Sequence, residues 1–149
     1  MNSTSEKVRT ASQRGFLNGV AALASLCSEW IGRSDVSVAL YAKADFPDRF
    51  VKDYRIRRPL TLTASPETFK QTLVQWFGAT PYRLTDHVVD LFEYELGKAQ
   101  QVYRAADERT LLDDLSGSEC GFGAYFFTED VFFVAFAEHM LVFLMGNNE

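Results

Sequence analysis

A cysteine with histidines elsewhere in the chain is the first combination in this sequence that could do chemistry. Cys120 lies in the glycine-rich stretch Gly117–Gly123, and the two histidines are His87 and His139. A thiol becomes a nucleophile when a histidine accepts its proton. The fragment Gly117–Gly121 has the length of a nucleophile elbow, but Glu119 stands where the serine belongs. We therefore interpret it as a connector whose glycines supply positive φ angles, and the sequence predicts no catalytic residue.

Three carboxylates form the second candidate site. Asp86, Asp90 and Glu93 recur at i, i+4 and i+7, which places them on one helix face beside His87. A hard metal ion would need oxygens that converge from a second element as well. We favour a solvated helix face and expect neither a metal ligand nor a cofactor. The fragment Gly121–Gly123 lacks the third glycine and the following helix of a phosphate-binding loop.

The basic residues cluster once, at Arg55, Arg57 and Arg58, with Lys52 and Tyr54 close by. Such a cluster can contact phosphate, but nucleic-acid-binding proteins spread more cations over their surface. The whole chain carries a net charge of −5. Edge strands also use charge to prevent pairing with other chains. We expect no nucleic-acid partner.

Charge is unevenly distributed along the chain. Residues 1–75 carry eleven Lys and Arg against seven Asp and Glu, whereas residues 76–149 carry four against thirteen. Such asymmetry bears on partners and not on fold. We expect an acidic surface that docks a basic protein. Its predicted contributors flank a short helix or face outward from it: Asp107, Glu108, Asp113 and Asp114.

The C-terminal stretch supplies the structural centre. Three short apolar runs, Gly123–Phe127, Val131–Phe136 and Met140–Met145, are separated by polar residues. Their length and their aromatic and β-branched content predict a three-stranded antiparallel meander. The middle run is apolar on both faces, as expected for a central strand that is covered on both sides.

The first half of the chain should cover and extend this sheet. Over Ser5–Ile31, an apolar stripe at helical spacing predicts a long helix. The stripe consists of Phe16, Val20, Leu23, Cys27 and Trp30. Alternation over Val36–Ala42 predicts a strand, Asp45–Asp48 a turn, and Phe50–Thr63, with its internal proline, an edge strand.

Helices are predicted over much of the middle of the chain. Ser65 is placed to cap a helix that ends at Gly78, and Thr85 a second that ends at Gly97. Lys98–Ala105 fits a strand, although continuation of the preceding helix stays open. Asp107 is placed to cap a last helix that buries Leu111, Leu112 and Leu115. The prediction is one α+β domain over residues 1–149.

The length and cysteine content bear on the size of the core and on the cellular compartment. A chain of 149 residues is long enough to bury a real core without disulfides. Two distant cysteines without a CxxC spacing fit a reducing compartment. Asn18 and Gly19 interrupt the N-terminal apolar run, which argues against a signal peptide, and no run is long enough for a membrane span. We expect a cytoplasmic protein, monomeric or homodimeric, with no membrane partner.

The terminal pattern YFFTEDVFFVAFAEHMLVFLMGNNE, together with the acidic second half, resembles small acidic bacterial immunity proteins of toxin–immunity pairs. The resemblance covers the last thirty residues or so and carries over no functional residue by position. It implies a non-enzymatic protein that binds and neutralises a basic toxin domain, often a nuclease, at or beside its active site.

Two other hypotheses stay open. One is a small-ligand-binding or enzymatic domain whose pocket lies between the aromatic sheet and the helices, with Cys120 and His139 as its reactive residues. The other is an adaptor subunit that works as a homodimer. A pocket lined by titratable groups with perturbed pKa values would favour the first of these.

Overall fold

The computed structural model describes residues 11–21, 34–77, 82–115 and 127–147, and its centre is a five-stranded sheet. The strand order is β1-β5-β4-β3-β2, and all neighbouring strands are antiparallel. The strands are β1 (Ser34–Ala42), β2 (Leu62–Ala64), β3 (Gln101–Ala105), β4 (Phe127–Ala135) and β5 (His139–Asn147). This arrangement, with the helices below, confirms the α+β class.

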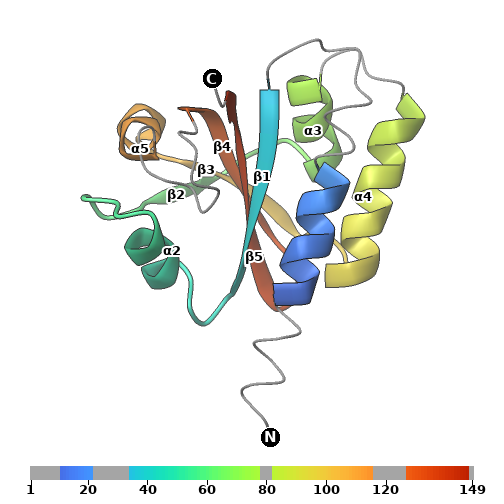
Figure 1. Cartoon of the computed structure of the whole chain (residues 1–149), viewed down its shortest axis with the longest axis horizontal. Helices are drawn as coiled ribbons and strands as arrows, with labels where there is room; N and C mark the ends of the chain where they lie inside the picture. The colour runs from blue at the N-terminus through green and yellow to red at the C-terminus, as the bar shows by residue number, and fades with distance from the viewer. Residues whose placement is uncertain (1–10, 22–33, 78–81, 116–126, 148–149) are drawn as a thin grey trace, which may run out of the picture.

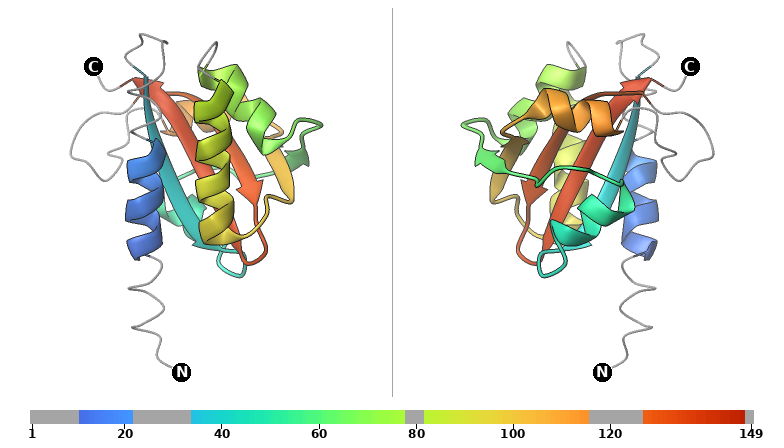
Figure 2. Two further views of the ribbon diagram at one scale, coloured as in Figure 1. Left: turned by 90° about the vertical axis from the view of Figure 1, so that its right-hand side faces the viewer. Right: turned by 90° about the vertical axis from the view of Figure 1, so that its left-hand side faces the viewer.

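Helices cover both faces of the sheet (Figure 1, Figure 2). One face carries the N-terminal helix (residues 11–21), α3 (Phe69–Phe77) and α4 (Tyr82–Leu96). The opposite face carries α2 (Asp48–Asp53) and α5 (Glu108–Leu115). The sheet therefore lies between two apolar cores, one under each helical layer.

A C-terminal meander is present, as predicted, but β3 supplies its third strand, because Phe127 of the first predicted run and Val131–Ala135 of the second lie in one strand, β4. Its middle strand β4 lies at the centre of the sheet, and Val131–Phe136 is fully buried. Phe132 belongs to the core under α3 and α4, whereas Phe133 belongs to the core under α2 and α5. Two-sided burial explains why this strand does not alternate between apolar and polar residues. Of the first predicted run, residues 123–126 lie outside the described part of the chain, and Phe127 begins β4.

The prediction that Phe16 lies on the buried stripe of the N-terminal helix is wrong. The helix buries Leu17 and Ala21, while Phe16 is 46% exposed; Leu23, Cys27 and Trp30 lie outside the described residues. The rotation of the helix is explained by Asn18, whose amide pairs with the backbone of β1. Its Nδ2 donates to the Val38 carbonyl at 2.9 Å, and its Oδ1 accepts from the Val38 N–H at 2.6 Å. The Asn18 side chain thus occupies the backbone N–H and C=O of Val38 on the edge strand, which could otherwise pair with another chain.

The edge strand predicted over Phe50–Thr63 is mostly wrong. Residues 48–53 form α2 instead, because Phe50 on this short helix is fully buried in the second core. Arg55 then adopts a left-handed conformation with φ 53°, which reverses the chain. Only Leu62–Ala64 pairs with β3, as the edge strand β2. The turn predicted at residues 45–48 is confirmed, since residues 43–47 form turns before α2.

The central helices are confirmed, but two predicted caps are wrong. At the start of α3, Thr68 and Gln71 form a capping box: each side chain accepts from the other's backbone N–H, at 3.1 and 2.9 Å. Ser65, the predicted cap, lies three residues before the capping residue. Helix α4 begins at Tyr82, so Thr85 is buried inside it, and Gly97 with φ 90° ends it as predicted. Within Lys98–Ala105, residues Gln101–Ala105 form β3, so the strand prediction is confirmed and the helix alternative is wrong for them.

A buried tyrosine makes stability sensitive to alkali. The Tyr41 hydroxyl donates to Asp53 Oδ2 at 3.0 Å. Burial raises the pKa of Tyr41 above the ordinary 10.0, and the neighbouring Tyr54 and Asp53 add to the rise. The folded protein therefore keeps this proton while the unfolded chain loses it above pH 10, so the free energy of unfolding falls as pH rises through that range.

Tyr41→Phe should consequently cost about 0.5–1.5 kcal/mol near neutral pH, from the lost hydrogen bond, and less in alkali. Urea unfolding of parent and variant at about pH 8 and about pH 11 measures the difference. A difference that stays constant or widens with pH would show that Tyr41 ionises as readily in the folded chain as in the unfolded one.

Candidate acidic docking surfaces

The four predicted contact residues lie on or next to α5, as the sequence suggested. Asp107 caps the helix: its Oδ1 accepts from the Thr110 N–H at 3.3 Å and its Oδ2 from the Thr110 hydroxyl at 2.7 Å. Leu111 and Leu115 are buried against the sheet, and Asp113 is exposed. These residues, Asp107, Glu108, Asp113 and Asp114, are called the α5 carboxylates below.

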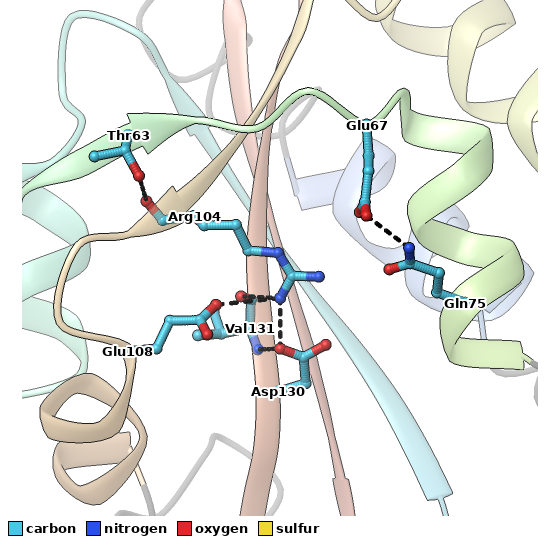
Figure 3. Close-up of polar contacts among 7 residues, drawn as sticks. All are labelled: Thr63, Glu67, Gln75, Arg104, Glu108, Asp130 and Val131. Atoms are coloured by element: carbon cyan, nitrogen blue, oxygen red, sulfur yellow. Dashed lines mark hydrogen bonds and ion pairs between the residues drawn. The ribbon is translucent and has the colours of Figure 1, made fainter.

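An arginine of the sheet pairs with one of the α5 carboxylates. Arg104 Nη1 on β3 lies 3.2 Å from Glu108 Oε1 and 2.6 Å from Asp130 Oδ1, so one guanidinium joins α5 to β4 (Figure 3). Burial of Arg104 works to lower its pKa, but the charges and hydrogen bonds of Asp130 and Glu108 outweigh it and raise the pKa. Glu108 is therefore already engaged within the fold.

Part of the segment that carries the basic cluster lies against the same helix. The backbone N–H of Arg57 donates to Asp114 Oδ2 at 3.4 Å. Hydrogen bonds from Thr110 hold the pKa of Asp107 below its usual range, and the positive charge of Arg58 acts in the same direction. A hollow of about 400 Å³, lined in part by Arg58, Asp107 and Asp114, separates the two segments. The basic and acidic patches predicted as separate features thus form one surface of mixed charge.

A second acidic surface lies on the other side of the sheet, along α4. Asp86, Asp90 and Glu93, considered above as metal ligands, line a hollow of about 490 Å³ between α4, the start of α3 and β3. We call it the α3–α4 groove; its charged lining residues are Glu67, Lys70, Asp86, Asp90 and Glu93. Figure 2 (left) looks onto this face, with α4 in front of the sheet.

Contacts within the fold hold most of the groove's charged side chains in place. Lys70 pairs with Asp86, and Glu93 Oε2 accepts from the Ala99 N–H at 2.9 Å. Glu67 Oε1 accepts from the Gln75 amide at 2.6 Å (Figure 3). Within the ranges that the structure describes, no group of three or more His, Cys, Asp and Glu side chains is arranged to hold a metal ion. The carboxylates of Glu67, Asp86, Asp90 and Glu93 line the groove with negative charge.

The sequence reasoning missed this groove. It identified the three carboxylates of α4, but Glu67 comes from the loop before α3, and only the tertiary packing of α3 on α4 brings it to the same hollow. The exposed aromatic ring of Tyr94 on α4 was missed as well. The helical spacing of Tyr94, two positions after the buried Phe92, could have indicated that it faces outward.

The hypothesis of a cysteine activated by a histidine concerns a residue that the structure does not describe, since Cys120 lies outside the described ranges. His139 is the half-buried first residue of β5, and His87 is exposed on α4. The rings of Phe92, Phe132 and Phe143 are fully buried where the sheet meets α3 and α4, and the hollow that remains between these helices and the sheet is the α3–α4 groove beside β3.

Two further findings bear on the kind of protein. In the described residues, none of the helices has the length and apolar character needed to cross a membrane. Comparison with protein-family models, with curated proteins and with solved structures gives no match to this chain.

Proposed function

We propose that this chain is a non-enzymatic protein-binding domain that neutralises a basic toxin domain through an acidic surface. The observation that carries the proposal is the orientation of the carboxylates in the second half of the chain. Both α4 and α5 bury apolar side chains against the sheet and turn acidic side chains outward, on opposite faces of it. These side chains can contact a partner without disturbing either core.

An immunity-type role agrees with this charge distribution. Thirteen Asp and Glu against four Lys and Arg in residues 76–149 give a field that attracts cationic proteins. A nuclease domain carries cations where it holds phosphates, so an acidic surface can cover such a site. The proposal includes a cytoplasmic location, where an immunity protein would meet such a toxin.

Affinity purification of the tagged chain from its native cell, followed by a growth test, examines the proposal. The partner domain should be basic, and its expression in a bacterial host should arrest growth unless this chain is co-expressed. An unrelated protein of similar negative charge, co-expressed in the same way, controls for non-specific charge effects. A tightly bound partner that is acidic, or one whose toxicity the chain does not relieve, would refute the neutralising role.

A further inference from the structure

The outward face of α4 exposes two large apolar side chains. Tyr94 is 86% exposed and Leu91 is 40% exposed. They stand three positions apart and so are neighbours on the helix surface. Because Val88, Phe92 and Leu96 already bury the inward face, neither Tyr94 nor Leu91 is needed to hold α4 on the sheet. Exposed tyrosines of this kind are enriched among the residues that dominate protein interfaces.

Negative charge adjoins these apolar side chains. Asp90 is exposed and stands four positions before Tyr94, so the two lie next to each other on the helix. Asp90 also lines the α3–α4 groove, together with Asp86 and Glu93. The apolar face of α4 therefore continues directly into a hollow that holds four carboxylates and one lysine, and that lysine is paired with Asp86.

The contrast with α5 indicates which acidic surface receives the partner. There, Glu108 is paired with Arg104, and Arg58 lines the same hollow as Asp107. A basic partner approaching α5 meets arginines of the same sign. The groove has less opposing charge, and Tyr94 beside it can stack on a guanidinium.

We infer that the outer face of α4 and the α3–α4 groove form the docking surface for a cationic segment of the protein partner. An arginine or lysine of that segment enters the groove, and Tyr94 and Leu91 pack on its flanking residues. This inference rests on the proposed function and moves the contact surface from the α5 carboxylates to the opposite face of the sheet. The charge complementarity between the groove and a basic segment selects this occupant.

An arginine–glycine repeat peptide is the probe, with a glutamine–glycine peptide of equal length as its neutral counterpart. In a titration followed by NMR, the amides of Glu67, Asp90, Glu93 and Tyr94 should shift most, and those of α5 should shift less. Asp90→Lys and Tyr94→Ala should each weaken peptide binding about tenfold, which corresponds to one interface hot spot. Tyr94→Phe should retain most of the affinity, because the ring remains.

Asp113→Lys is the matched control, since it makes the same charge change at an exposed position of α5. It should change the affinity less than about twofold, as expected of a distant rim charge. Equal losses from Asp90→Lys and Asp113→Lys, larger shifts on α5, or equal binding of the two peptides would each overturn the groove assignment. None of these outcomes would touch the proposed function, which fails instead when the purified partner is acidic or its toxicity is not relieved.

Discussion

Replacing Phe143 with alanine should lower the free energy of unfolding by about 3–5 kcal/mol, the usual cost of truncating a buried phenylalanine. Phe143 on β5 is 1% exposed. Its ring stacks on Phe132 of β4 at a centroid distance of 4.8 Å, with 5° between the planes. It also meets Phe92 of α4 at 5.3 Å and Phe69 of α3 at 5.5 Å. The truncation removes contacts with the sheet and both helices at once.

Chemical denaturation of parent and variant measures this loss, with Tyr94→Ala as the matched control. The control also removes an aromatic ring, but from the surface, and should change stability by no more than about 0.5 kcal/mol. If Phe143→Ala melts together with the parent, the ring is not part of the core, and the aromatic sheet must be reconsidered as a binding surface.

Replacing Arg104 with methionine should cost about 1–3 kcal/mol, since it leaves two carboxylates without their cation. The Arg104 and Asp130 side chains are 24% and 26% exposed, so water reaches the pair and the cost stays below that of a fully buried one. Arg104 Nη1 also donates to the Val131 carbonyl at 3.4 Å, and its guanidinium lies 5.7 Å from the centre of the Phe132 ring. The side chain therefore joins β3, β4 and α5.

A double-mutant cycle with Asp130→Asn separates the pair energy from the loss of packing. The two changes together should cost less than the sum of the single changes, by about 1 kcal/mol. Glu108→Gln, whose side chain is 41% exposed, should show a weaker coupling to Arg104. Additive costs for Arg104 and Asp130 would mean that the contact contributes packing and no ion-pair energy.

Much of the fold follows from local patterns. Apolar spacing predicts α3, α4 and α5, and Gly97 predicts the end of α4, because helical period and chain termination are properties of neighbouring residues. The Asp107 cap is local for the same reason, since its partner Thr110 is three residues away. The continuous apolar run of β4 indicates a covered central strand, which the structure confirms.

Other features depend on contacts between distant residues, which a local pattern does not contain. The rotation of the N-terminal helix is set by the contact between Asn18 of the helix and Val38 of the edge strand β1, which is twenty positions further along the chain. Helix α2 forms where an edge strand was predicted, because the second core takes up Phe50. At the start of α3, Ser65 and Thr68 both suit a cap, and the reciprocal bonds with Gln71 decide for Thr68.

The features of the candidate site also divide into those that follow from neighbouring residues and those that depend on distant contacts. That the α5 carboxylates face outward is a local consequence of the leucine spacing, and the structure agrees for Asp113. The contact between the backbone of Arg57 and Asp114 spans 57 positions, so no local pattern predicts that this basic segment lies against α5. The α3–α4 groove joins Glu67 to Asp90 through tertiary packing and was unpredictable for the same reason.

The association rate of this chain with its purified partner domain, measured from about 50 to about 500 mM salt, tests the central claim most directly. Electrostatic steering between an acidic surface and a basic protein predicts that the rate falls steeply as salt rises, while the dissociation rate changes less. An association rate that is independent of salt would contradict docking through an acidic surface.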